Sequence, residues 1–229
     1  MKKFLRILLL FVVLLIIISI IFFKQIFYLK YEAPEVSSTN GDFYSKIVDK
    51  INASFLDIIS GTKQIKLDEN FINQQLKNKL EKEDNFQVSK SFLKKEYTFE
   101  VKDLWVNIDE EYLYFFGNLC LNDKYYSSVK LVLTLAKEDD YIIIKFEKAE
   151  VGKLNLSRKQ SFALITYAFD EKYDFGEFDK SNQSFKLSVD YINEQIANYV
   201  YIDIFLLDDI TLGNKELIVT FLINKKFFQ

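Results

Sequence analysis

The order of apolar and polar positions divides the chain into a long apolar run near the N-terminus, a short polar stretch and a mixed remainder. The only charge within residues 4–23 is Arg6, which lies near the start of the run. At about 1.5 Å of rise per residue, a helix of this length matches the roughly 30 Å apolar core of a bilayer. The pattern therefore predicts a transmembrane helix over residues 4–23.

The flanks of this run indicate a signal anchor that is retained. A cleavable signal peptide ends in small residues, whereas this run continues into Lys24 and the bulky Ile26 and Phe27. The only cysteine lies far from the run, so no lipid anchor is expected. Because basic residues crowd the N-terminal flank, the positive-inside rule predicts a cytoplasmic tail at residues 1–3 and an extracytoplasmic C-terminal domain on the cell membrane.

Residues 24–42 are predicted to form a tether between the anchor and the domain. This stretch holds the only proline of the chain, Pro34, and a cluster of small polar residues at 37–41. The remaining residues 43–229 suffice for one domain that buries a core without disulfides. One extracytoplasmic domain is therefore expected.

Apolar residues of the domain recur at helical spacing in two places and alternate in several others. Residues 43–60 have helical periodicity and are followed by Gly61, and residues 157–169 carry apolar positions on one helical face. Alternating segments separated by polar turns predict an antiparallel meander, followed by C-terminal strands with a turn at 213–215. The predicted strands cover residues 97–106, 111–121, 125–136, 141–151 and 201–224.

An internal repeat relates residues 64–80 to residues 184–200. Each copy predicts a short strand, a polar helix start at Asp68 or Ser188, and a short helix. Repeats at this long spacing favour two similar halves over a solenoid. The expected fold class is α+β, with a curved antiparallel sheet, packed helices and two similar halves, plus the N-terminal transmembrane helix.

Each copy of the repeat also places an asparagine at the same position, Asn73 or Asn193. Either amide could belong to a binding site. An amide at a joint between strand and helix more often satisfies backbone groups, however. We therefore interpret both asparagines as structural.

Two short segments carry a resemblance to a known family. A Lys-Leu strand leads into an Ile-Asn helix at residues 66–73, and Ala-Glu-Val-Gly-Lys-Leu-Asn-Leu at residues 149–156 precedes a helix. In this order, behind an N-terminal anchor, they resemble the YpmS-like family of membrane-anchored extracytoplasmic bacterial proteins. The resemblance implies a location and a topology, and it transfers no catalytic residue. The helix-and-curved-sheet halves of that family also look like those of tubular lipid-binding domains.

The residue types exclude several classes of enzyme site. The chain has no histidine, which removes Ser-His and Cys-His nucleophile pairs and imidazole metal ligands. Cys120 lies between Leu119 and Leu121 in an apolar strand, so a buried thiol is expected there. The six glycines are scattered and form no phosphate-binding loop.

Groups of acidic residues are the remaining candidates for catalysis or metal binding. All lie at predicted turns, where adjacent acids normally face water, and their spacing does not match a calcium-binding loop. These groups are Asp109-Glu110-Glu111, Asp139-Asp140 and Asp208-Asp209. The formal net charge of −3, without a cluster of Lys and Arg, gives no reason to expect nucleic acid as a partner. We predict a non-catalytic protein that uses no metal or cofactor.

The predicted strands carry apolar residues on both faces, which favours apolar surroundings on both sides of the sheet. One interpretation is ordinary core packing beneath covering helices. The other is that a curved sheet and a helix enclose an apolar groove for acyl chains. The residues predicted to line this groove are Phe99, Leu113, Phe115, Leu133, Ile144 and Phe146.

Two functional classes follow from these patterns. The first is a membrane-tethered module that binds a lipid or another apolar ligand of the cell envelope. The second is a non-enzymatic scaffold that binds envelope proteins through exposed tyrosines and through its transmembrane helix. The tyrosines available for such a contact are Tyr125, Tyr126, Tyr199 and Tyr201. A continuous apolar cavity favours the first class, and a tightly packed domain favours the second.

Overall fold

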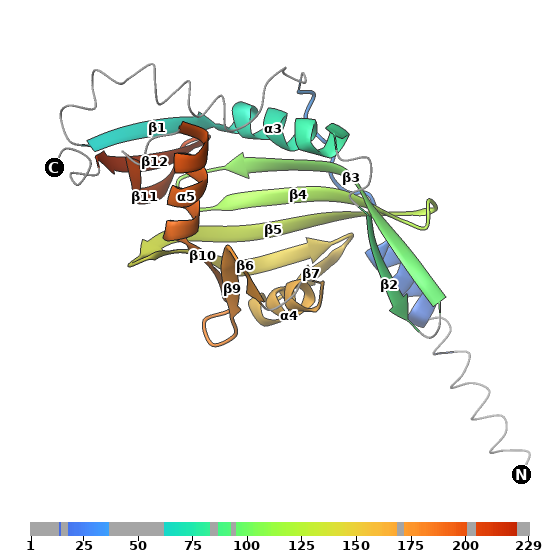
Figure 1. The fold of residues 1–229 in the computed structure, drawn as a ribbon. Coiled ribbons are helices and arrows are strands. Elements are labelled where there is room, and N and C mark those ends of the chain that lie inside the picture. Colours follow the sequence, from blue (N-terminus) through green and yellow to red (C-terminus); the bar gives the residue numbers. More distant parts are fainter. Residues whose placement is uncertain are drawn as a thin grey trace, which may run out of the picture.

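The computed structural model describes Leu14 and residues 18–36, 62–82, 87–92, 95–168, 172–200 and 205–223. The fold is α+β, as predicted, and the strand pairs within these residues are antiparallel (Figure 1). The helix predicted over residues 43–60 lies outside the described residues, as does most of the predicted transmembrane run. In the described part of the chain, no helix has the length and apolar character needed to cross a membrane.

A large sheet of nine strands forms the body of the molecule. Its strands follow the order β2-β3-β4-β5-β6-β10-β9-β8, and β7 pairs with β6 off this path. Strands β3 to β6 confirm the predicted meander, because each alternating segment pairs with the next across a short polar turn. The strands are β2 (Gln87–Phe92), β3 (Lys95–Ile108), β4 (Leu113–Leu121), β5 (Tyr125–Glu138), β6 (Tyr141–Val151), β7 (Leu154–Leu156), β8 (Lys172–Tyr173), β9 (Gly176–Asp179) and β10 (Ser184–Ser188).

A smaller sheet of three strands brings together two distant parts of the chain in the order β1-β12-β11. Strand β12 (Glu216–Ile223) pairs with β1 (Thr62–Asp68) on one side and with β11 (Phe205–Gly213) on the other. The turn between β11 and β12 follows Gly213, where the sequence predicts it.

The acidic groups differ in where the structure places them. Asp109-Glu110-Glu111 lie between β3 and β4, and Asp139-Asp140 lie between β5 and β6, both at turns as predicted. The prediction of a turn at Asp208-Asp209 is wrong, because both residues lie inside β11. The register of β11 shifts between Leu207 and Asp209. A bulge of this kind leaves one residue unpaired, which accommodates adjacent polar residues within a strand.

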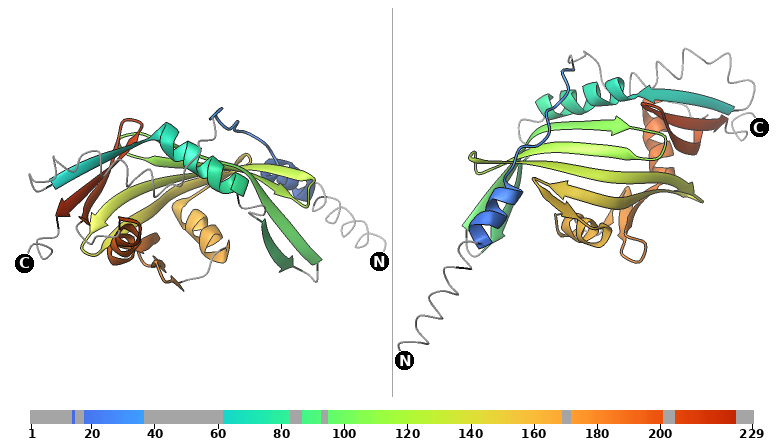
Figure 2. Two further views of the ribbon diagram at one scale, coloured as in Figure 1. Left: turned by 45° about the horizontal axis from the view of Figure 1, so that its top comes forward. Right: turned by 180° about the vertical axis from the view of Figure 1, so that it is seen from behind.

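Among the described residues that follow the N-terminal segment, three helices pack against these sheets. They are α3 (Glu69–Lys82), α4 (Arg158–Ala168) and α5 (Val189–Val200). Figure 2 shows the large sheet arching over α4 and α5. We call the side that faces these two helices the inner face, and the opposite side the outer face. Because successive strand residues point to opposite sides, Leu113 and Phe115 lie on the inner face and Tyr114 and Phe116 on the outer face.

The main core joins the small sheet to one end of the large sheet. Side chains from both sheets and from α3 and α5 contribute to it, so neither sheet has a core of its own at this end. Partly buried residues of α5 and β12 surround this cluster. Its buried members are Ile65, Leu67, Phe71, Ile142, Val189, Leu207 and Phe221.

The two copies of the repeat form the same local structure. In each, a strand runs directly into a helix, β1 into α3 and β10 into α5. The Phe71 N–H donates to Asp68 Oδ1 at 2.8 Å, and the equivalent Tyr191 N–H donates to Ser188 Oγ at 3.2 Å. Both polar residues therefore cap their helices, as the sequence predicts.

Asn73 and Asn193 bind the backbone of a neighbouring strand, as predicted. Asn73 Nδ2 donates to the Val106 carbonyl oxygen at 3.0 Å, and Asn73 Oδ1 accepts the Val106 N–H at 2.7 Å. This part of β3 lies beyond the stretch that pairs with β2. Asn193 Oδ1 accepts the Leu207 N–H at 2.8 Å, next to the bulge in β11. Each helix is thus fixed to backbone groups at the edge of a strand.

Asn73→Ala is expected to destabilise the protein more than Asn193→Ala. Asn73 is 3% exposed, and its removal leaves two buried backbone groups unpaired, at about 1–3 kcal/mol each. Asn193 is partly buried and binds one N–H, so a loss of about 1 kcal/mol is expected. Urea unfolding of the full-length protein in detergent, followed by the fluorescence of its single tryptophan, measures both losses. An equal or smaller loss for Asn73→Ala contradicts the bridging role.

Candidate functional site

Five of the six residues predicted to line an apolar groove come together on the inner face. Leu113 of β4 pairs with Leu133 of β5, which pairs with Phe146 of β6, so these three form a row across the sheet. Phe115 and Ile144 lie two residues from that row, along β4 and β6. All five belong to one apolar cluster.

The sixth predicted residue, Phe99, is not brought to this cluster. It pairs with Leu121 at the far end of β4 from Leu113. Eight strand residues span about 26 Å at 3.3 Å each, so β4 separates the two positions. The Phe99 side chain lies outside the described part of the structure.

Aromatic rings from α4 and from the β9–β10 hairpin cover one side of the cluster. Phe162 of α4 has its ring centroid 6.0 Å from that of Phe146 and 6.0 Å from that of Phe178. Phe178 in turn meets Phe185 at 4.9 Å, edge to face. Sequence reasoning found Phe162 through its helical face but missed the other two rings. The pairing of β10 with β6, which places Phe185 beside Ile144, has no signal in the local pattern.

Side chains of the cluster that lie next to α4 and the β9–β10 hairpin are buried, and those nearer the middle of the sheet are partly exposed. Leu133, Phe146, Phe162 and Phe185 are at most 9% exposed. Residues nearer β4 keep part of their side-chain surface exposed, although they lie on central strands. The partly buried members on β4, β5 and β6 are Leu113, Phe115, Leu131 and Ile144. Partial exposure of large apolar side chains at the centre of a sheet leaves surface for an apolar contact.

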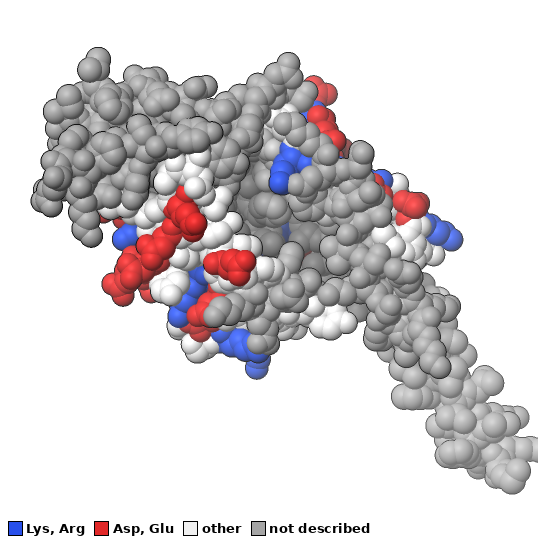
Figure 3. All heavy atoms as spheres, in the orientation of Figure 1, with Lys and Arg blue, Asp and Glu red and all other residues white. Residues whose placement is uncertain are grey.

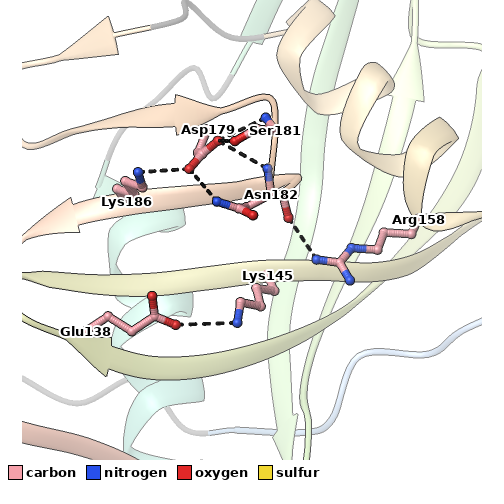
Figure 4. Close-up of polar contacts among 7 residues, drawn as sticks. All are labelled: Glu138, Lys145, Arg158, Asp179, Ser181, Asn182 and Lys186. Carbon is pink, nitrogen blue, oxygen red and sulfur yellow. Dashed lines mark hydrogen bonds and ion pairs between the residues drawn. The ribbon is translucent and has the colours of Figure 1, made fainter.

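Polar contacts hold the turn of the β9–β10 hairpin (Figure 4). Asp179 accepts hydrogen bonds from Ser181 and Asn182 and forms an ion pair with Lys186 at 2.8 Å. The Arg158 side chain donates to the Asn182 carbonyl oxygen at 2.8 Å, which ties the start of α4 to the same turn. The hairpin and α4 therefore support the cluster as one unit.

A second group of contacts joins residues 25–31 to the large sheet. Strand β6 pairs with β5 only from Val129 onward, so the first residues of β5 extend beyond the end of β6. The N-terminal segment takes the vacant place, because the Ser128 N–H donates to the Tyr28 carbonyl oxygen at 3.1 Å. The Gly152 N–H donates to the Ser128 carbonyl oxygen at 2.8 Å. The described part of the predicted tether therefore packs on the sheet.

The N-terminal segment crosses from the inner face to the outer face at this point. Ser127 Oγ donates to the Ile26 carbonyl oxygen at 2.7 Å, and Ser128 Oγ accepts the Tyr31 N–H at 3.1 Å. Successive strand residues point to opposite sides of a sheet. The helical residues 18–26 therefore end on the inner side, and Tyr31 lies on the outer side.

Gly152 permits this close approach. Its φ is 59°, and a Cβ atom there would overlap the carbonyl oxygens of Gln25 and Ile26. The Lys153 N–H donates to the Gln25 carbonyl oxygen at 2.7 Å. The carbonyl groups in the last turn of a helix have no partner within the helix. The turn between β6 and β7 thus supplies a partner for one of them, that of Gln25.

Lys30, Tyr31 and Glu150 form a polar latch on the outer face. Lys30 Nζ and Tyr31 Oη both donate to Glu150 Oε2. Burial acts to raise the pKa of Glu150, but the hydrogen bonds from Lys30 and Tyr31 outweigh it, and the pKa is lowered. The hydrogen bond to Glu150 is also the largest cause of a raised pKa for Lys30. The latch therefore favours the charged forms of both residues at neutral pH.

An open pocket of about 410 Å³ lies beside this latch. The Trp105 ring stacks on the Phe116 ring at 5.2 Å, and Lys130 Nζ lies 5.4 Å from the centre of the Phe116 ring. This pocket faces away from the predicted groove residues, and no sequence pattern predicted it. Its lining residues are Lys30, Tyr31, Glu32, Trp105, Asn107, Phe116 and Lys130.

Two side chains of types that can react, Cys120 and Asp109, have structural roles. Cys120 is 1% exposed, so its thiol is buried as predicted. Asp109 accepts the N–H groups of Tyr112 and Glu111 and the hydroxyl of Tyr114, and the Tyr112 N–H is the largest cause of its lowered pKa. Within the described residues, no three His, Cys, Asp or Glu side chains are grouped closely enough to hold a metal ion.

Comparison of the chain with protein-family models, with curated proteins and with solved structures found no match. Function is therefore inferred from the inner-face cluster and from the contacts of residues 25–31.

Gly152→Ala is expected to release residues 25–31 from the sheet, because the added methyl group meets backbone atoms at a positive φ. Trypsin should then cleave after Lys24 and Lys30 faster in the variant than in the wild-type full-length protein. Gly213→Ala is the control, since its Cβ would meet only side-chain atoms, at 3.0 to 3.3 Å. Unchanged cleavage in Gly152→Ala contradicts the close packing.

Asp179→Asn is expected to flatten the acid dependence of stability. The contact with Lys186, then those with Ser181 and Asn182, lower the pKa of Asp179. The stabilisation is therefore complete above the unfolded pKa of about 3.9 and is lost as the pH falls toward the lowered value. The variant should melt at a lower temperature than the wild type at neutral pH and lose less on acidification below about pH 4. Exposed Asp123→Asn is the control, and parallel pH profiles for Asp179→Asn and the wild type contradict the prediction.

Proposed function

We propose that the protein is a single-pass membrane protein whose extracytoplasmic domain binds a lipid or another apolar molecule of the cell envelope without catalysing a reaction. The observation that carries the proposal is the group of partly exposed apolar side chains on the inner face of the arched sheet. Membership of the YpmS-like family is part of the proposal and rests on residues 66–73 and 149–156. A division into two similar halves is also proposed, on the basis of the two strand-helix units.

The membrane anchor is supported by the apolar run at residues 4–23 and by the described residues at its end. Those residues are helical, and their large side chains are exposed. Ile18, Ile20, Ile21 and Phe22 have exposed fractions of 51 to 55%. A helix surface of this kind suits contact with lipid chains.

Ligand contact is supported by the arrangement of the inner face. Figure 1 looks onto this face, where α4 and α5 cover parts of the sheet and the middle of β4 and β5 lies between α3 and α4. The side chains there are aliphatic or aromatic, like those that line the pockets of lipid-binding proteins. Leu113 and Phe115 are the members of the cluster on β4, and they lie at the start of this strand.

The non-catalytic character is supported by the chemistry of the side chains. The chain has no histidine, and its one cysteine is buried. Asp109 and Asp179 bind hydrogen-bond donors of their own turns, which is a structural role. The domain is therefore proposed to act by binding.

A scaffold that binds envelope proteins is the second candidate. The rings of Phe146, Phe162, Phe178 and Phe185 are in mutual contact, and three of these residues count among the buried ones. Dense packing between α4 and β6 favours this candidate. In this candidate, the exposed Tyr126 and the partly buried Tyr125 contact a protein partner, and the partly exposed side chains of β4 offer it a further apolar contact. Tyr201 and the side chain of Tyr199 lie outside the described residues.

Photochemical crosslinking in the intact protein distinguishes the two candidates. The photoreactive residue p-benzoylphenylalanine replaces Phe115 on the inner face or, as the control, Tyr114 on the outer face of the same strand. After illumination of cells that produce the full-length chain, mass spectrometry identifies the adducts. The proposal predicts lipid adducts at position 115 and none at position 114.

Two results oppose this outcome. Protein adducts at position 115, without lipid, favour the scaffold. If position 115 crosslinks only to other residues of the same chain, the protein itself covers the inner face, which contradicts ligand binding there.

A further inference from the structure

The turn between β4 and β5 lies beside the end of the N-terminal helical segment. The ring of Tyr125, the first residue of β5, lies 4.9 Å from that of Phe23, edge to face, and 5.4 Å from that of Phe27. Phe23 is the last residue of the predicted membrane span. This contact therefore places the β4–β5 turn at the level where the span ends.

Large side chains remain exposed next to this contact. Tyr126 is 47% exposed, Tyr28 is 41% exposed and Leu29 is 51% exposed. Tyrosine is enriched at membrane-water interfaces, because its ring is apolar and its hydroxyl is polar. The exposed residues thus have the chemistry of an interfacial surface.

Lysines accompany these aromatic residues. Lys124 Nζ lies 5.3 Å from the centre of the Tyr125 ring, and Lys153 Nζ lies 3.9 Å from the centre of the Tyr28 ring. Both lysines are exposed, as is Lys24 in the helical segment. Long lysine side chains can lie along apolar surface while the ammonium group reaches lipid headgroups.

The opposite end of β5 carries three consecutive acidic residues. Glu138, Asp139 and Asp140 are exposed there. Figure 3 shows several acidic side chains, with some basic ones between them, at the end of the molecule where β5 ends and α5 lies. An anionic bilayer would attract the lysine end and repel the acidic end.

We propose that the β4–β5 turn, together with Tyr28 and Leu29, rests in the headgroup region of the bilayer that holds the anchor. The domain is then held in one orientation, with the β5–β6 turn directed away from the membrane. The inference rests on the proposed membrane anchor.

A protein partner could also use exposed tyrosines. The lipid surface is favoured because Tyr125, at the same turn, already contacts Phe23, which is the last residue of the proposed membrane span. A protein that covered Tyr126 would have to bind at the bilayer surface.

Fluorescence quenching in nanodiscs tests the orientation with the full-length protein. Tyr126→Cys carries a bimane label, and the bilayer contains phosphatidylcholine and phosphatidylglycerol, with or without lipids that bear a quenching doxyl group near the headgroup. Tyr141→Cys is the matched control, since Tyr141 is a tyrosine of similar exposure, 41%. It pairs with Glu138, which is 12 residues beyond Tyr126, or about 40 Å at 3.3 Å per residue. Both variants also carry Cys120→Ala, because Cys120 pairs directly with Tyr126 across the strands, and labelled Cys120→Ala protein sets the background.

The inference predicts that doxyl lipids remove most of the fluorescence at position 126 and none at position 141. Equal quenching at both positions, or none at position 126 in protein that co-elutes with nanodiscs, overturns the orientation and leaves the anchor intact. Protein that does not enter nanodiscs overturns the anchor and the inference together.

Discussion

The hydrogen-bonding needs of one short strand edge determine how the N-terminal segment joins the domain. The first residues of β5 extend past the end of β6, and buried backbone groups there require partners. The Tyr28 carbonyl oxygen accepts the Ser128 N–H. The Ser127 hydroxyl donates to the Ile26 carbonyl oxygen, and the Ser128 hydroxyl accepts the Tyr31 N–H. Because β6 ends in a turn that contains Gly152 and Lys153, the turn also receives the carbonyl end of the helical segment. The segment is therefore part of the folded domain, and a membrane anchor attached to it would hold the domain in a fixed direction.

Hydrogen bonds to backbone groups at strand edges also explain why α3 does not lie over the middle of the inner face. Asn73 fixes α3 to the backbone of β3 at the edge of the large sheet, and Asn193 fixes α5 to the edge of β11. The helices of both strand-helix units are thus attached at strand edges. Among the described helices, α4 lies over Phe146 through Phe162, and α5 packs near Ile142 at the start of β6. The partly exposed apolar side chains of β4 follow from this placement, and the proposed ligand contact depends on it.

The alternation of apolar and polar residues predicted the strands of the meander and the side of the sheet to which their side chains point. The two-residue alternation of β4, β5 and β6 located these strands within about two residues and assigned Leu113, Phe115, Leu133, Ile144 and Phe146 to one cluster. Alternation assigns a face but no position along a strand, so Phe99 was grouped with residues at the other end of β4. The β10 pairing and the bulge at Asp208 arise from contacts between distant segments.

The contacts of residues 25–31 could not be predicted, because most of them use backbone groups, which carry no sequence pattern. The motif at residues 149–156 nevertheless holds Glu150 and Lys153, which bind this segment, and Gly152, which permits its close approach. Hydrogen–deuterium exchange of the wild-type full-length protein in nanodiscs tests most directly whether this segment belongs to the domain. The amides of Lys30 and Tyr31, which both donate to Ser128 Oγ, are expected to exchange as slowly as that of Ser128. Exchange at the rate of an unfolded chain, with β5 still protected, would contradict it.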